Sequence, residues 1–111
     1  MPSRRGRAPE RTGRFQRAAL GQADVTTVAQ ALKAGDDTPC ILEGRVVASP
    51  PKHEHFLFED PTGQIEVNID DEIFAGRVLS PRVTVRLYGE VEKDLFKKPE
   101  IDVDRFEIIG N

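Results

Sequence analysis

The tetrapeptide Asp-Pro-Thr-Gly at residues 60–63 is the feature that most constrains the fold of this chain. Its aspartate can hydrogen bond to the amides that follow, its proline presets φ at the second turn position, and its glycine tolerates a positive φ. Apolar and polar residues alternate on both sides of it, in residues 55–60 and 64–70. A turn of this chemistry between two such segments predicts a β-hairpin.

Three further segments show the two-residue period of a strand: residues 40–49, 82–93 and 100–110. Gly44 lies inside the first of them and predicts a bend or bulge. A phase shift before Phe106 predicts a bulge in the last one. The residues expected to face the core are Ile65, Val67, Ile69, Val83, Val85, Leu87, Val91, Ile101, Val103, Phe106 and Ile108. Those expected to face outward are Glu59, Glu66, Asn68, Thr84, Arg86, Tyr88 and Glu90.

Two helices are predicted as well. The first begins after Thr26 or Thr27, either of which can cap it, and ends at Gly35. Its inner face is expected to contain Val28, Ala31 and Leu32. The second, at residues 71–76, ends at Gly76 and starts with an acidic run consisting of Asp70, Asp71 and Glu72. Helix capping explains this run better than calcium binding, because the run lacks the alternating oxygens and central glycine of an EF-hand loop.

Five strands with a short helix between the third and the fourth follow the order of an OB-fold, a small five-stranded Greek-key barrel. A five-stranded open sandwich is the alternative, and the position of the helix argues against it. The predicted class is therefore all-β, with an OB-fold domain in residues 25–111.

The charge of the chain is divided unevenly. Residues 1–20 contain six arginines and one glutamate, a net charge of +5, whereas residues 21–111 contain 10 basic and 18 acidic residues, a net charge of −8. Residues 1–24 have little apolar periodicity and cannot bury enough surface to offset the entropy of ordering. We therefore expect a disordered basic tail followed by an acidic barrel.

Three stretches of the sequence resemble a known family. They are TTVAQALKAGDDTPCILEGRVV at 26–47, FLFEDPTGQIEVNIDDEIFAG at 56–76, and VRLYGEVEKD at 85–94 followed by EIDVDRFEII at 100–109. Together they are similar to the bacterial OB-fold (BOF) stress-tolerance family of the YgiW/YdeI type. The resemblance implies an OB-fold protein that is normally exported to the periplasm and contributes to tolerance of oxidants, metals or cationic antimicrobial agents. It implies no enzymatic activity and no catalytic residues, and some relatives are connected with the binding of envelope components.

The chain departs from this family pattern in two places. No apolar signal segment is visible near its start, so a cytoplasmic location stands as the alternative to the periplasm. No apolar run reaches the roughly 18 residues that a membrane-spanning helix needs. The loop SPPKHEH at residues 49–55 is also unusual, with two prolines and two histidines.

An OB-fold commonly binds oligonucleotides or oligosaccharides across its second and third strands and the flanking loops. The candidate ligand-binding residues on this face and rim are Glu66, Asn68, Arg86, Tyr88, Lys93, Lys97 and Lys98. We expect the three lysines in the loop between strands four and five, where a solvated loop is favoured over an anion or glycan contact. Nucleic-acid binding by the barrel is not favoured, because its charge repels phosphate and Tyr88 is its only tyrosine.

His53 and His55 could share a metal ion with Glu54 or Glu59 as a third ligand, but exposed loop histidines are the favoured interpretation. The single cysteine, Cys40, is expected to be a buried thiol. No set of nucleophile, base and orienting group is visible, so neither a cofactor nor an enzyme is predicted.

The sequence thus predicts a non-enzymatic OB-fold binding module in bacterial envelope stress tolerance. Its partner would be a small molecule, a glycan or an envelope protein. The alternative is a nucleic-acid-associated OB-fold protein that uses its arginine-rich tail.

Overall fold

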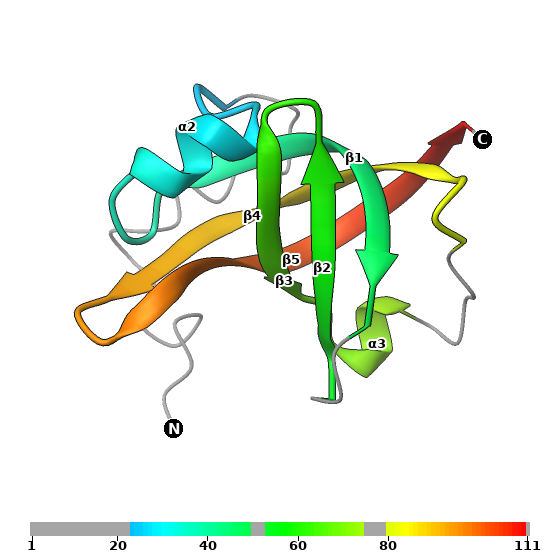
Figure 1. Cartoon of the computed structure of the whole chain (residues 1–111). Helices are drawn as coiled ribbons and strands as arrows, with labels where there is room; N and C mark the ends of the chain where they lie inside the picture. The colour runs from blue at the N-terminus through cyan, green and yellow to red at the C-terminus, as the bar shows by residue number, and fades with distance from the viewer. Residues whose placement is uncertain (1–22, 50–52, 75–79, 111) are drawn as a thin grey trace.

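The computed structural model describes residues 23–49, 53–74 and 80–110. Its five strands form a closed barrel in the order β1-β2-β3-β5-β4 (Figure 1). The elements are α2 (Val28–Lys33), β1 (Pro39–Ala48), β2 (His55–Asp60), β3 (Gly63–Asn68), α3 (Asp71–Phe74), β4 (Thr84–Asp94) and β5 (Lys97–Gly110). This architecture confirms the predicted OB-fold, its N-terminal helix and the helix between the third and fourth strands. The predicted basic tail lies almost entirely outside the described residues, as does Gly76.

The barrel closes through two junctions. β1 pairs with β4 in its first half and with β2 in its second, so that one strand joins both ends of the sheet. β3 and β5 run parallel, and their ladder is short, with residues 66–68 opposite residues 100–102. The other neighbouring strands are antiparallel, which fits a chain of hairpins completed by one parallel contact.

Gly44 lies where β1 changes partner, and the predicted bend is confirmed. It pairs with Val85 of β4, and the next residue, Arg45, pairs with Glu59 of β2. A Cβ atom on Gly44 would lie 2.2 Å from the carbonyl oxygen of Glu59 and 2.8 Å from the ring of Phe58. Only glycine therefore permits this approach of the two strands.

Apolar side chains from all five strands and α2 fill the barrel. The largest fully buried side chains are Val28, Cys40, Leu42, Phe58, Val67, Ile69, Val85, Leu87, Val91, Ile101 and Val103. The predicted bulge in β5 is also present, since Tyr88 pairs with Arg105 and Gly89 with Val103, leaving one extra residue between them. This shift allows Phe106, with 7% exposure, to face the core.

Four predictions of burial are wrong, and one of them concerns Tyr88, which was expected to face outward and is only 6% exposed. Ile108 is 50% exposed although it pairs with Val85 of β4, because it lies past Asp102, where the ladder between β5 and β3 ends. Leu32 is 40% exposed, because the six-residue helix α2 buries only Val28 and Ala31. Glu90 is only 3% exposed, because it lies in the middle of β4 with neighbouring strands on both sides.

The turn at residues 60–63 has the predicted chemistry and an additional role. Asp60 Oδ1 accepts hydrogen bonds from the backbone N and the Oγ1 of Thr62, at 2.8 and 2.6 Å. Its Oδ2 accepts from the backbone N of Val28 at 2.9 Å, and Thr62 Oγ1 accepts from that of Ala29 at 2.9 Å. The hairpin turn therefore binds two of the free amides at the start of α2.

The remaining turn and cap residues differ from the sequence expectation at one position. Thr27 is the N-cap of α2, and its side chain accepts from the backbone N of Gln30 at 3.1 Å. Gly63 has φ of 155°, a region suited to glycine. The predicted C-terminal role of Gly35 is wrong, because α2 ends in an extended Ala34 and the positive φ, 68°, falls on Asp37.

The Asp60 carboxylate should contribute strongly to stability. Asp60→Ala removes three hydrogen bonds from a buried charged group, so we expect the free energy of unfolding to fall by about 3 kcal/mol in urea titrations. Asp94→Ala is the matched control, because Asp94 accepts a similar bond from the amide of Phe96, at 2.8 Å, on an exposed hairpin. Asp94→Ala should lower the free energy of unfolding by less than about 1 kcal/mol. Equal decreases in the two variants would contradict this role of Asp60.

Gly44→Ala should destabilise the barrel by about 3 kcal/mol, because the added methyl group overlaps the backbone of β2. Gly35→Ala provides the comparison, since a Cβ there meets nothing within 4 Å. We expect it to leave stability unchanged within about 0.5 kcal/mol. If Gly44→Ala unfolds at the wild-type urea midpoint, the close approach of β1 and β2 does not explain why residue 44 is a glycine.

Candidate functional site

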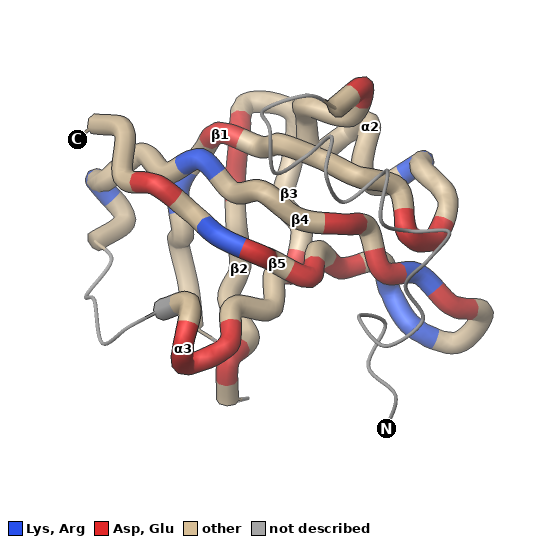
Figure 2. The backbone as a smooth tube through the Cα atoms, turned by 180° about the vertical axis from the view of Figure 1, so that it is seen from behind, with Lys and Arg blue, Asp and Glu red and all other residues tan. Residues whose placement is uncertain are grey.

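The outer face of β3, β5 and β4 is lined with carboxylates that face one another across the strands. Glu66 lies opposite Glu100, which in turn lies opposite Glu92. Glu90 lies opposite Asp102 one step further along the sheet. Figure 2 shows the acidic positions along β4 and β5 from behind. We call Glu66, Glu90, Glu92, Glu100 and Asp102 the acidic sheet face. Like charges directly opposite one another destabilise a sheet.

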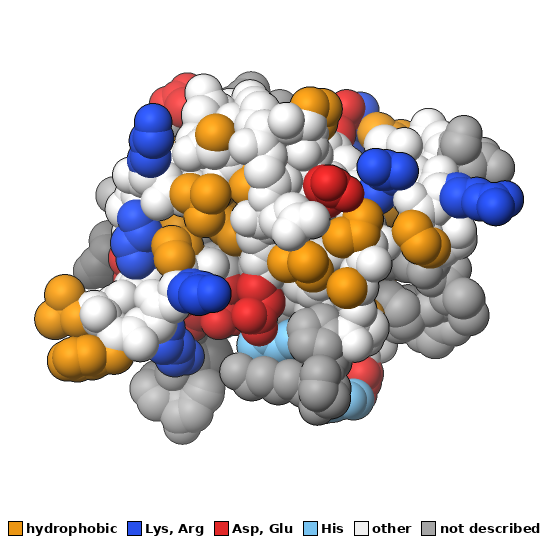
Figure 3. Space-filling view, viewed as in Figure 1, with side chains coloured by type: hydrophobic (Ala, Val, Ile, Leu, Met, Phe, Trp, Pro, Cys, Tyr) orange, Lys and Arg blue, Asp and Glu red, His pale blue; other side chains and the backbone are white. Residues whose placement is uncertain are grey.

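His55 of β2 points into this face. Its Nδ1 donates a hydrogen bond to Glu66 Oε2 and lies 3.9 Å from Glu100 Oε1. Its side chain is 12% exposed, compared with 37% for Glu66 and 10% for Glu100. Figure 3 shows acidic side chains gathered beside a histidine on this side of the barrel. One imidazole and two carboxylates from three strands thus share a largely covered position.

The surroundings of Glu100 favour its protonated form. Burial raises the pKa of Glu100, the neighbouring carboxylate of Glu92 raises it further, and Glu66 acts in the same direction. His55 and Lys97 oppose this effect through their positive charge. Charging this carboxyl group therefore costs free energy in the folded protein.

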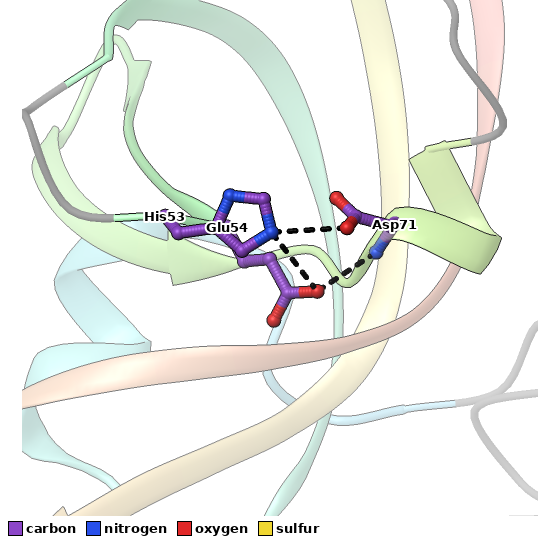
Figure 4. Close-up of side chains that lie close together, drawn as sticks. All are labelled: His53, Glu54 and Asp71. Atoms are coloured by element: carbon purple, nitrogen blue, oxygen red, sulfur yellow. Dashed lines mark hydrogen bonds and ion pairs between the residues drawn. The ribbon is translucent and has the colours of Figure 1, made fainter.

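His53 belongs to a different group from His55. Its Nε2 donates to Asp71 Oδ2 at 2.9 Å and lies 3.8 Å from Glu54 Oε2 (Figure 4). Glu54 Oε2 also accepts from the backbone N of Asp71 at 3.0 Å, and Glu54 has a positive φ of 68°. The favoured interpretation of two exposed loop histidines fits His53, which is 75% exposed, but is wrong for His55, which lies in β2 and is 12% exposed. The two side chains contact different carboxylates, so the structure does not bring them together as the less favoured metal pair. Glu59, the other suggested ligand, is 3.7 Å from Arg45.

Arg86 and Tyr88 of β4 pair with residues 107 and 105 of β5, whereas Glu66 and Asn68 of β3 pair with residues 100 and 102 of the same strand. Arg86 contacts Glu43 at 2.7 Å and Glu107 at 3.2 Å. Tyr88, 6% exposed, donates to Glu107 Oε1 at 3.1 Å, and the guanidinium of Arg105 lies 3.7 Å from the centre of its ring. The hydrogen bond from Tyr88, together with one from Arg105, lowers the pKa of Glu107. A face of the Tyr88 ring on which a base or sugar could stack is thus covered by a cation.

The lysines expected in one loop lie in two strands. Lys93 belongs to β4, where its Nζ donates to the carbonyl of Leu32 at 3.2 Å and so caps the end of α2. Lys97 and Lys98 begin β5 and are exposed. Between the strands, Leu95 and Phe96 are 92% and 93% exposed. The seven candidate residues are therefore spread over three areas of the barrel, and their role as ligand contacts stays a prediction.

Cys40 is a buried thiol, as expected. It is fully covered within the core, and burial raises its pKa to about 12, with a smaller contribution from Asp104. A thiol in this state is a poor nucleophile at neutral pH. Among the helices of the described part of the chain, none is long and apolar enough to cross a membrane.

Glu100 should make stability depend on pH. Its pKa is higher in the folded than in the unfolded state, so its unfavourable effect appears as the pH rises above about 4.5. In chelator-treated buffer, Glu100→Gln should therefore raise the melting temperature at pH 7 and have a smaller effect at pH 4. Glu43→Gln, which removes a partner of Arg86, should give no gain at pH 7. A lower melting temperature for Glu100→Gln at pH 7 would contradict the unfavourable charge.

Known proteins are similar to this chain over most of its length. A family model described as "Bacterial OB fold (BOF) protein" matches residues 6–108. The calcium-regulated OB-fold protein CarO of Pseudomonas aeruginosa is 44% identical over 84 residues, which cover 76% of this chain and 71% of CarO. Protein YgiW of Escherichia coli K12 is 39% identical over 79 residues, which cover 71% of this chain and 59% of YgiW.

Solved structures show the same fold. The structure of YgiW from E. coli has a TM-score of 0.71 and 36% identity, covering 78% of this chain and 90% of that one. A domain of replication protein A from Methanococcus maripaludis has a TM-score of 0.60 at 20% identity, covering 78% and 97% of the two chains, and this shows the fold alone. Because the family model spans nearly the whole sequence and is supported by these relatives, the chain belongs to the bacterial OB-fold (BOF) protein family.

Proposed function

We propose that this protein is a non-enzymatic binding module that acts in bacterial envelope stress tolerance. It recognises a small molecule, a glycan or a protein partner through the outer face of its barrel and the adjoining loops. We place this activity in the periplasm, following the family resemblance. The family supports a binding role, and the surface of the barrel supports the choice of ligand class.

The observation that carries the choice of ligand is the acidic sheet face. An OB-fold that binds single-stranded nucleic acid needs a positive groove and exposed aromatic rings. Here Glu66 of β3 lies opposite Glu100 of β5, which in turn lies opposite Glu92 of β4, and the ring of Tyr88 is covered by Arg105. Phosphate groups would be repelled from this surface, whereas neutral or cationic groups would not.

The exposed hairpin between β4 and β5 supports a protein or glycan partner. Leu95 and Phe96 extend into solvent at its tip, with Lys97 and Lys98 beside them. Apolar side chains with almost complete exposure are common at surfaces that contact a partner. One relative is by name calcium-regulated. An acidic surface attracts cations, and this attraction is a physical basis on which cations could influence binding.

A titration with single-stranded DNA tests the choice of ligand class. We expect the full chain to bind a labelled oligonucleotide weakly at low salt and not at physiological ionic strength, because the excess of positive charge lies in the six arginines of residues 1–20 and the rest of the chain is net negative. A matched full-length variant with glutamine at these six positions should show no change in fluorescence anisotropy. Salt-resistant, sub-micromolar binding by this variant would overturn the proposal and make the barrel a nucleic-acid-binding domain.

A further inference from the structure

The group formed by His55, Glu66 and Glu100 has the composition and placement of a metal site. The three side chains come from β2, β3 and β5, and their ligand atoms all lie within 4.8 Å of one another. Strands hold side chains more rigidly than loops do, so the group is set in place by the barrel itself. The site does not depend on the ligand proposed above, since it requires only the folded barrel.

Glu100 provides a second and independent observation. Its side chain is nine-tenths buried, at 10% exposure, and no hydrogen bond to its carboxylate is present among the described residues. Its Oε1 points toward His55 Nδ1 at 3.9 Å, beyond hydrogen-bonding distance. Glu66 and Glu92 lie directly opposite it on the two neighbouring strands. The charged form of a buried carboxylate between two others needs more positive charge than His55 and the exposed Lys97 supply.

We propose that His55 Nδ1, Glu66 and Glu100 bind a divalent transition-metal ion, with zinc as the preferred occupant. An imidazole nitrogen combined with carboxylates suits zinc and its neighbours in the first transition series. Calcium and magnesium prefer sites made of oxygen atoms alone, so His55 selects against them. Because the site has no cysteine ligand, a soft monovalent ion such as copper(I) is also disfavoured.

The geometry needs only small side-chain movements to accept the ion. In a tetrahedral zinc site the ligand atoms lie about 2.0–2.2 Å from the metal and hence about 3.4 Å from each other. The separation of 3.9 Å between His55 and Glu100 is close to this value. The hydrogen bond between His55 and Glu66 would be replaced by two bonds to the metal. Three protein ligands leave a fourth position for water or for a donor group of a bound partner.

The second group, formed by His53, Glu54 and Asp71, is a weaker candidate. His53 and Asp71 are 75% and 71% exposed, and Glu54 already accepts the amide of Asp71 near the start of α3. These contacts are explained by the local structure of the loop and the helix. The group therefore serves as the matched control, since it also has one histidine and two carboxylates but no buried carboxylate.

Isothermal titration of the full-length, metal-free protein with zinc chloride tests the proposal. We expect one zinc ion per chain for the wild type and for His53→Ala. We expect at least about a tenfold loss of affinity in His55→Ala and in Glu100→Gln. Titration with calcium chloride should give no binding at this site. Cobalt(II) provides a second readout, because a four-coordinate site containing a histidine gives intense visible absorption that Glu100→Gln should abolish.

The outcomes separate clearly. Circular dichroism of the metal-free variants shows which are folded, and His55→Gln replaces His55→Ala if the latter is not. Absence of stoichiometric zinc binding by the wild type would overturn the proposal. So would an equal loss in His53→Ala and His55→Ala, or wild-type zinc affinity in folded Glu100→Gln. Binding of calcium in preference to zinc would overturn the choice of metal and of ligands together.

Discussion

The hydrogen bonds accepted by the Asp60 carboxylate hold the β2–β3 turn and the start of α2 together, and the arrangement of this end of the barrel depends on them. One oxygen of this carboxylate shapes the β2–β3 turn through Thr62, and the other accepts the amide of Val28 at the start of α2. The turn and the helix therefore stabilise each other, because the turn side chains accept hydrogen bonds from backbone amides that have no acceptor within the helix. This contact sets Val28 over the core, where its side chain also lies 3.6 Å from the position a Cβ of Gly63 would take. A local turn signal thus positions a helix that is 32 residues away in the chain.

Much of the fold could be predicted because it rests on local patterns. Alternation identified the strands, the Asp-Pro-Thr-Gly turn identified the hairpin, and Gly44 identified the bend. Burial was harder to predict. Alternation shows which way Glu90 points but not how much of it the neighbouring strands cover. It also does not show that Ile108 lies past the point where the ladder between β5 and β3 ends.

The candidate site could be predicted only in part, because it depends on how distant strands are aligned. Glu66 was recognised as an outward residue, but its partner Glu100 comes from a parallel contact whose register no local signal encodes. His53 and His55 are two residues apart, which suggested a shared ligand, yet they turn to different neighbours. Lys93 was expected in a loop, whereas its contact with Leu32 requires the folded position of α2. The periodicity of a sequence therefore does not predict side-chain contacts between segments that are far apart in the chain.

The short parallel ladder between β3 and β5 has a consequence for how the barrel opens. It joins only residues 66–68 to 100–102, whereas β4 and β5 are paired along almost their whole length. Segments with few shared hydrogen bonds are the first to separate in local unfolding. Glu66 and Glu100 face each other across this seam, so their repulsion favours its opening and any bound cation favours its closure. Binding of a cation at this ladder and closure of the barrel are therefore thermodynamically linked, so the ions around the protein can act on how readily the barrel opens.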